Sequence, residues 1–259
     1  MSLRIAVVQQ ETVPGDVERN RAKALSFARE ALSERPDVIV FPEELLVGYH
    51  ERARELAEDV NGPTTQAFRD LLEGTDTLVL YGLTERAGDR FYISAPLVSA
   101  RGVLANYRKT HLWWAETGLR HEPTFYSPGD ALVTFDLKGA RCGVMICYDG
   151  DFPEMTRSYA NLGCQVLFWL SNCEHRGHEQ VKPLAVANSM IIASCCCTGK
   201  DEAARFCRGG SNITNFDGAL LAEIWDREGV IFAGVNPEAV PEHRRQNPRF
   251  TGRRPELYV

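Results

Sequence analysis

Short apolar runs alternate along the chain with longer segments of helical spacing. Apolar side chains between residues 17 and 35 recur every three or four positions, which predicts an amphipathic helix capped by Asp16 and ended by Pro36. Residues 38–41 are apolar throughout, and such a run is typical of a strand covered on both faces. The chain therefore combines buried strands with helices that have one apolar face.

The same periodicities predict the other elements. Further helices are expected over residues 64–73, 153–162 and 178–190. Strands are expected over residues 4–10, 77–83, 165–170, 191–197 and 229–235, and strand pairs over 90–98 with 102–109, 131–136 with 141–147, and 211–215 with 219–224. Because several strand pairs are joined by short turns, we expect one domain with a mixed sheet arrangement and helices outside.

Composition and charge narrow the class of protein. The chain has 259 residues, of which 44% are hydrophobic, and its net charge is −6, from 29 Lys and Arg against 35 Asp and Glu. The acidic balance argues against a nucleic-acid binder, which needs clustered basic side chains. No apolar stretch is long enough to span a membrane, and no secretory signal is visible. We therefore expect a cytoplasmic protein.

Cysteine is the unusual residue in this composition. Eight cysteines lie at positions 142, 147, 164, 173, 195, 196, 197 and 207. In a reducing compartment they are not expected to form disulfides, and no pair has the spacing of a zinc site. The three consecutive cysteines fall in a predicted strand, whose side chains alternate between faces, so they cannot share one ligand. We expect buried thiols for most of them, and no metal or cofactor.

Cys147 has a setting that differs from the others. It ends the apolar run 142–147, and a polar turn separates it from a helix that begins near Pro153. A thiol between a strand end and a helix N-terminus is exposed by the turn and feels the positive end of the helix dipole, which favours the thiolate. This is the setting of a cysteine nucleophile, although free cysteines are more often small buried apolar residues.

Two charged residues share this strand-end placement. Glu43 follows the run 38–41 and Pro42, and Lys109 follows the strand that ends at Arg108. Either residue alone is most simply explained as a solvated surface side chain. Together with Cys147 they offer a carboxylate, an ammonium and a thiol, which are the groups that amide hydrolysis by a thiol requires.

The chain resembles a known family, the nitrilase superfamily of carbon–nitrogen hydrolases. The resemblance extends over nearly the whole chain and is strongest in three segments that occur in the family's order. They are Phe41-Pro42-Glu43-Glu44 with Gly48-Tyr49, Tyr107-Arg108-Lys109-Thr110-His111-Leu112, and Gly143-Val144-Met145-Ile146-Cys147-Tyr148-Asp149 with Phe152-Pro153-Glu154.

The resemblance implies a fold, an assembly and a set of catalytic residues. The fold is an α/β four-layer α-β-β-α sandwich, and members usually form homodimers or larger assemblies, for which residues 238–259 could serve as an arm. The family's Glu–Lys–Cys triad falls on Glu43, Lys109 and Cys147, and a fourth carboxylate falls on Glu122. Glu44 is the rival of Glu43, but the family places the catalytic carboxylate directly after the proline.

The residue types give each group a role in amide hydrolysis. Cys147 attacks the carbonyl carbon, while Glu43 takes the thiol proton, returns a proton to the leaving amine and activates the water that hydrolyses the thioester. Lys109 and the backbone N–H of Tyr148 stabilise the oxyanion. Glu122 orients Lys109 or the substrate.

The substrate is less determined than the chemistry. Aromatic residues flank the catalytic positions, and Cys173 follows the strand 165–170 on the same side. We expect substrate contacts from Tyr49, Trp113, Tyr148, Phe152 and Cys173, although each could equally belong to the core or a lid. The segments 147–154 and 185–188 resemble amidase-type members.

Asp151 stands where carbamoylases often carry an arginine, which favours an amide that bears an amine over one that bears a carboxylate. Other departures from the family pattern are Ile93, Leu184 and Gly209-Gly210-Ser211. We therefore expect an amidase of a small carboxylic amide. The alternatives are a nitrilase, an N-carbamoyl amine hydrolase, or a non-catalytic binding or scaffold member; the last would have no reason to keep all three groups.

Overall fold

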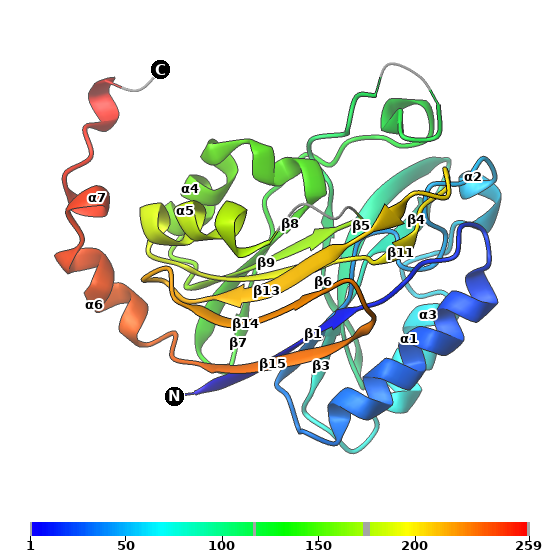
Figure 1. The fold of residues 1–259 in the computed structure, drawn as a ribbon, viewed down its shortest axis with the longest axis horizontal. Helices are drawn as coiled ribbons and strands as arrows, with labels where there is room; N and C mark the ends of the chain where they lie inside the picture. The colour runs from blue at the N-terminus through cyan, green and yellow to red at the C-terminus, as the bar shows by residue number, and fades with distance from the viewer. Residues whose placement is uncertain (1, 116–117, 173–176, 258–259) are drawn as a thin grey trace.

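Two β-sheets pack against each other between two layers of helices in the computed structural model, which describes residues 2–115, 118–172 and 177–257 (Figure 1). Helices α1 (Val17–Leu32) and α3 (Pro63–Leu71) cover one sheet, and α4 (Pro153–Asn161) and α5 (His178–Asn188) cover the other. This arrangement confirms the expected four-layer α-β-β-α sandwich. None of the described helices is long and apolar enough to cross a lipid bilayer.

The first sheet has seven strands, in the order β15-β1-β2-β3-β5-β4, with β6 also paired to β5. They are β1 (Leu3–Gln9), β2 (Val38–Val40), β3 (Leu78–Leu80), β4 (Leu83–Ala87), β5 (Arg90–Ser99), β6 (Gly102–Arg108) and β15 (Gly229–Val235). Strands β1, β2 and β3 are parallel, and two successive antiparallel pairings, β3 with β5 and β5 with β6, make β6 run in the direction of β2. The carboxyl ends of β2 and β6 therefore point the same way.

The second sheet has six strands, in the order β14-β13-β10-β9-β8-β7. They are β7 (Thr134–Leu137), β8 (Ala140–Ile146), β9 (Val166–Ser171), β10 (Ile191–Cys196), β13 (Gly209–Thr214) and β14 (Leu220–Trp225). Because β8, β9 and β10 are parallel, the residues that follow them also gather at one edge. A small hairpin of β11 (Gly199–Lys200) and β12 (Phe206–Cys207) lies beyond β10.

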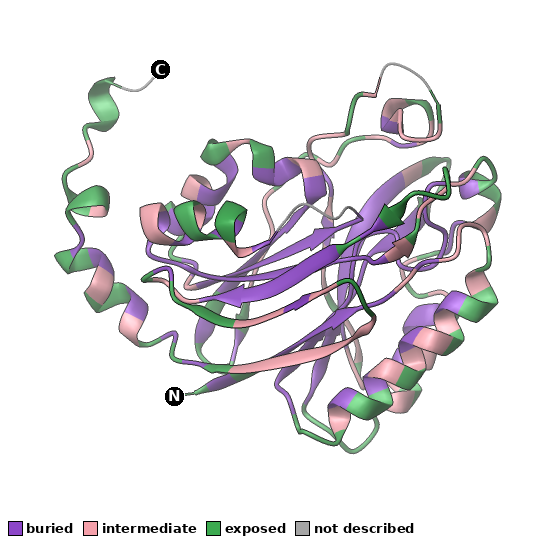
Figure 2. Cartoon of the chain, in the orientation of Figure 1, coloured by how far each residue is buried: buried purple, intermediate pink, exposed green. Residues whose placement is uncertain are grey.

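The core lies between the sheets and under the helices, as the continuous burial of the central strands shows (Figure 2). Strand β2 is buried on both faces, which explains why residues 38–41 are all apolar. The seven described cysteines are buried and free of disulfides, and the thiol of Cys195 donates to the backbone oxygens of Val8 and Val40 on the other sheet. Cys173 lies outside the described residues.

Residues 77–83 do not form the single strand that the sequence predicts. Strand β3 ends at Leu80 and β4 begins at Leu83, and both pair with β5 in the same register, so Tyr81 and Gly82 interrupt one run of strand. A Cβ atom at Gly82 would lie 2.4 Å from the Cα of Glu43, so only glycine permits this close approach. The interruption of the strand is therefore what lets the chain cross behind Glu43.

The ends of other elements also differ from the sequence prediction. Helix α1 ends at Leu32, three residues early, and Arg35 takes a left-handed conformation that turns the chain toward β2. The short helix α2 (Ala53–Leu56) was not predicted, nor were α6 (Ala239–Gln246) and α7 (Pro248–Thr251) in the C-terminal segment. Few apolar side chains and mostly short lengths leave weak periodicity in these segments, so their helices depend on tertiary contacts.

One such contact holds α6 against the sandwich. The buried guanidinium of Arg244 donates to the backbone oxygens of Ala160, Cys164 and Asn188, which lie at or near the ends of α4 and α5. Carbonyls at helix ends lack the full set of partners inside the helix, and Arg244 supplies donors to this region.

Candidate active site

Lys109 is the centre of a buried ionic cluster at the edge where β2 and β6 end. Its ammonium donates to Oε1 of Glu43 at 2.7 Å and to Oε1 of Glu122 at 2.8 Å, and all three side chains are fully buried. Burial alone would lower the pKa of Lys109, but the charges of Glu122 and Glu43 raise it well above its ordinary value. The lysine is therefore charged, and two of its three N–H donors are in use.

Glu43 is held at both of its carboxylate oxygens. While Oε1 accepts from Lys109, Oε2 accepts the backbone N–H of Asn172 at 2.8 Å, just beyond the end of β9. This bond joins the two sheets, because Glu43 belongs to the first and Asn172 to the second. The carboxylate is thereby fixed in one orientation.

Glu122 begins a short 3-10 turn, Glu122–Thr124, and binds three groups. Besides Lys109, its Oε1 accepts the hydroxyl of Tyr49 at 2.9 Å, and its Oε2 accepts the backbone N–H of Trp113 at 2.7 Å. Burial raises the pKa of Glu122 and Lys109 opposes this shift. Burial and the charge of Glu122 raise the pKa of Tyr49 well above its ordinary value, so the phenol stays protonated and donates.

Cys147 lies beside this cluster, directly after β8. Its negative charge, when ionised, raises the pKa of both Lys109 and Tyr49, so the thiolate and the lysine ammonium interact electrostatically. The side chain keeps 9% of its surface exposed, while its backbone oxygen accepts the indole N–H of Trp169 at 3.0 Å. Its φ of +44° is a left-handed conformation, which costs a non-glycine residue about 1–3 kcal/mol and is found mainly at functional sites.

The turn after Cys147 and the start of the next helix lie where the sequence predicts them. A 3-10 turn, Cys147–Asp151, separates the cysteine from α4, so the thiol does not lie directly at the first turn of that helix. The expected helix-dipole contribution is therefore smaller than predicted, since the dipole acts mainly within one turn. Lys109 is the cation on which stabilisation of a thiolate depends more.

Asp149 is a structural part of the site that the sequence analysis did not single out. Its buried carboxylate accepts the backbone N–H of Ile146, the Tyr107 hydroxyl, the Thr110 hydroxyl and the backbone N–H of His111, at distances of 2.7–3.0 Å. The ring Nδ1 of His111 lies a further 3.0 Å away. Asp149 therefore ties the residues around Lys109 to the residue before Cys147. An acidic residue two positions after the proposed nucleophile, in the strand-to-helix turn, was the available signal.

Replacing Asp149 with asparagine is expected to lower kcat by one to two orders of magnitude while KM changes little. The amide NH₂ of asparagine would face an N–H or O–H donor whichever way it turned, and an unsatisfied buried donor costs about 1–3 kcal/mol. Urea unfolding measures this loss, and the rate of Cys147 alkylation measures the misplaced thiol. Tyr107→Phe, which removes one donor only, is the matched control. Equal kcat in the Asp149→Asn variant and the wild type would contradict the positioning role.

The structure brings three of the predicted substrate residues together. The ring of Trp113 meets that of Tyr148 edge-on at 4.8 Å, and Tyr148 meets Phe152 at 5.1 Å. Phe152 also stacks on His111, with ring centroids 4.0 Å apart. These rings form an aromatic wall next to Cys147 that a substrate can contact, since Trp113 is 39% exposed. Asp151 is exposed at the end of the same turn.

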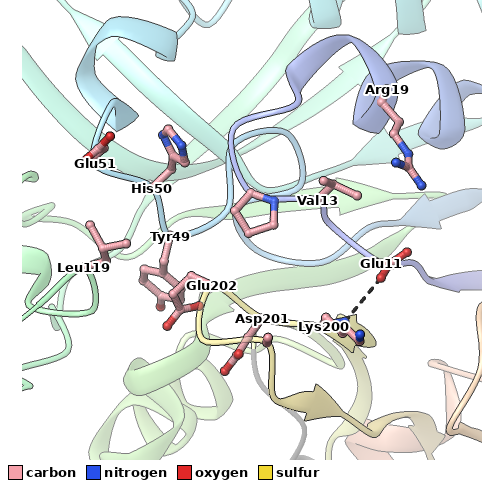
Figure 3. A pocket seen from close by; sticks show the side chains of 12 residues that line it. Glu11, Val13, Arg19, Tyr49, His50, Glu51, Leu119, Lys200, Asp201 and Glu202 are labelled. Carbon is pink, nitrogen blue, oxygen red and sulfur yellow. Dashed lines mark hydrogen bonds between the residues drawn. The ribbon is translucent and has the colours of Figure 1, made fainter.

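Tyr49 lies on another side of the cluster, where a cavity of about 540 Å³ opens to solvent (Figure 3). Figure 3 shows the Tyr49 ring turned toward Asp201 and Glu202, with Leu119 and His50 beside it. The guanidinium of Arg120 lies 4.7 Å above this ring and forms an ion pair with Glu202. Tyr49 thus separates the buried cluster from an open, charged cavity.

The arrangement can perform acyl transfer. A thiol, a carboxylate that can move a proton and an ammonium with one N–H not bonded to any described residue lie together in a site largely shielded from water.

The carbon–nitrogen hydrolase family model matches residues 4–245. The omega-amidase NIT2 of Homo sapiens is 28% identical, over 100% of this chain and 97% of its own. A Pseudomonas protegens protein called "Hydrolase in pqqF 5'region" is 32% identical, over 99% of this chain and 91% of its own. An (R)-stereoselective amidase of a Pseudomonas species is 35% identical, over 64% of this chain and 58% of its own.

Solved structures show the same fold. A carbon–nitrogen hydrolase superfamily protein of Xanthomonas campestris, with an arsenic adduct in its active site, matches with a TM-score of 0.88 at 23% identity, over 98% of both chains. A mutant amidase of Nesterenkonia, from the nitrilase superfamily, matches with a TM-score of 0.83 at 22% identity, over 99% of this chain and 95% of its own. With the family model matching nearly the whole length, this chain belongs to the carbon–nitrogen hydrolase family of the nitrilase superfamily.

Proposed function

We propose that the protein is an amidase that hydrolyses a small carboxylic amide to the acid and ammonia, through a thioester on Cys147. The observation that carries this proposal is the buried Lys109, which holds Glu43 and Glu122 in place beside the Cys147 thiol. The names of the relatives, an omega-amidase and a stereoselective amidase, support the same type of reaction.

Acylation uses Cys147, Glu43 and Lys109. The thiol proton passes to Glu43 as the sulfur forms a bond to the amide carbon, and the electron pair of the C=O bond moves to oxygen. The third N–H of Lys109 and the backbone N–H of Tyr148 stabilise this oxyanion. The C–N bond then breaks as Glu43 protonates the nitrogen, which releases ammonia and leaves the thioester.

Deacylation reverses these roles with water in place of the thiol. Glu43 accepts a proton from water as the water oxygen attacks the thioester carbon, and the C–S bond breaks as the sulfur regains a proton. The products are the free acid and the original thiol, so the sum is one amide and one water converted into one acid and one ammonia. Glu122 keeps Lys109 oriented through both steps.

The aromatic wall of Trp113, Tyr148 and Phe152 is proposed to contact the acyl part of the substrate, and Tyr49 to border it. Asp151, exposed at the end of the same turn, would attract a cationic group. We therefore propose that amides that bear an amine are preferred over amides that bear a carboxylate.

Ammonia release from a panel of substrates tests this function. We expect small amides to be turned over at least about tenfold faster than nitriles of the same acyl group, and amine-bearing amides to have a higher kcat/KM than carboxylate-bearing ones. Asp151→Asn is expected to reduce that preference without changing kcat for a neutral amide. Preferred release from nitriles or N-carbamoyl amines would identify another activity of the family, and preference for the carboxylate-bearing amides would refute the role of Asp151.

A further inference from the structure

Glu44 is a buried carboxylate that the proposed reaction does not use. It directly follows Glu43, and its φ of +52° is a left-handed conformation that turns its side chain away from Lys109. The hydroxyl of Thr84 on β4 donates to its Oε2, and the hydroxyl of Tyr126 lies beside the same carboxyl group. Its other oxygen, Oε1, is buried without a hydrogen-bond partner among the described residues. Glu44 is fully buried.

The other buried glutamates near this site all have a cationic partner. Glu58 pairs with Arg21, Glu85 pairs with Arg108, and Glu43 and Glu122 share Lys109. The charged groups that act on Glu44 are instead the carboxylates of Glu43 and Glu122, and both oppose its ionisation. A buried carboxylate without a cation takes up a proton, because its desolvation is not compensated.

The contacts of Glu44 connect the two carboxylates that flank Lys109. On one side it is covalently next to Glu43. On the other side Tyr126 donates its backbone N–H to the backbone oxygen of Glu122 at 2.9 Å, so the turn that carries Glu122 also carries the hydroxyl beside Glu44. A change at Glu44 is therefore transmitted to both neighbours of the lysine.

We propose that Glu44 is a positioning residue that acts as a neutral carboxylic acid: it links the Glu43 and Glu122 segments without adding a third negative charge around Lys109. This inference rests on the proposed function of the site. Ionisation of Glu44 would add a third negative charge that acts on the Glu43 and Glu122 carboxylates. The added charge disfavours the Cys147 thiolate and the oxyanion, the two anions that the reaction forms.

The pH profile of kcat/KM tests this role. Burial raises the pKa of Glu44 to about 8, so the wild-type profile is expected to fall above pH 8. The amide of the Glu44→Gln variant carries no charge, so its kcat/KM is expected to start falling only at a higher pH. The ratio of variant to wild-type kcat/KM should therefore rise about tenfold between pH 7 and pH 9. Tyr126→Phe removes a hydroxyl that lowers the pKa of Glu44. The kcat/KM of this variant should therefore also fall at a higher pH than that of the wild type.

Stability measured against pH tests the protonation of Glu44 independently of activity. With a pKa of about 8 in the folded state and 4.5 otherwise, Glu44 takes up a proton on folding between these values. The raised pKa makes the wild type lose stability as pH rises from 4.5 to 8. The ratio of the folding constants of Glu44→Gln and wild type should therefore grow about tenfold per pH unit over this window and then level off.

Two results would overturn the proposal: an alkaline limb that is the same in Glu44→Gln and wild type, or a stability difference that does not vary with pH. Failure of the proposed function has a different signature, which is amide hydrolysis that persists without Cys147. In that case the stability measurement still decides whether Glu44 is protonated.

Discussion

Replacing Cys147 with alanine is expected to lower kcat/KM for amide hydrolysis by at least about four orders of magnitude, because no other group in the cluster can form the acyl intermediate. The fold should be retained. The side chain is small, and the contact of its backbone oxygen with Trp169 does not involve the thiol. Ammonia release measures the loss, and circular dichroism measures the fold.

Mass spectrometry of the intact protein separates loss of the nucleophile from loss of binding. The wild type mixed with a slowly hydrolysed amide should gain the mass of the acyl group, and Cys147→Ala should gain none. The remaining described cysteines provide the internal control, since all are buried and burial raises the pKa of Cys142 and Cys195 above the ordinary value. Acylation of the alanine variant, or activity close to the wild type, would refute the thioester mechanism.

Replacing Lys109 with methionine is expected to affect both stability and activity. Removal of the cation that binds both Glu43 and Glu122 leaves two buried carboxylates facing each other, and breaking a buried ion pair in this way costs about 3–5 kcal/mol. Loss of an oxyanion donor and of the aligned carboxylate should lower kcat by at least about 10²–10³-fold. Urea unfolding and steady-state kinetics measure the two effects.

The pH dependence of the Lys109→Met variant has a definite sign. Without the lysine, burial and mutual repulsion raise the pKa of the Glu43 and Glu122 pair, so the folded variant holds protons that the unfolded chain releases. Its stability is therefore greatest in acid and falls as the pH rises through the raised pKa. The double variant Lys109→Met, Glu122→Gln should regain much of the stability but none of the activity. A single variant as stable as the wild type at pH 7 would show that the cluster is not the ionic unit described here.

The sequence predicts the strand ends that carry the proposed catalytic residues, but some other element boundaries differ in the structure. The strands predicted before Glu43, Lys109 and Cys147 became β2, β6 and β8. The apolar runs of β2 and β8 are almost wholly buried, and β6 was predicted as the second strand of a hairpin. Over residues 77–83 the predicted strand is interrupted at Gly82, where the chain comes close to the backbone of Glu43. No local pattern records such a contact between distant segments.

The different roles of Glu43 and Glu44 also depend on contacts between distant segments that no local pattern records. Two adjacent glutamates have the same chemistry, and only the family resemblance favoured the first. In the folded chain the left-handed φ at Glu44 sends the two side chains to different surroundings, one to Lys109 and the other to Thr84. Their pKa values and roles follow from these surroundings and from burial, which are tertiary properties.

By itself the sequence determined the layered α/β architecture, the family and the kinds of chemical group available. Periodicity and residue type are local properties, so they can be read from the sequence without knowledge of the fold. Tertiary structure decided which groups meet. Residues 66 positions apart become 2.7 Å neighbours in Glu43 and Lys109 because β6 is turned parallel to β2 by two antiparallel pairings. It also decided the contacts of Asp149 and the burial of Glu44, since both depend on segments that only sheet packing brings together.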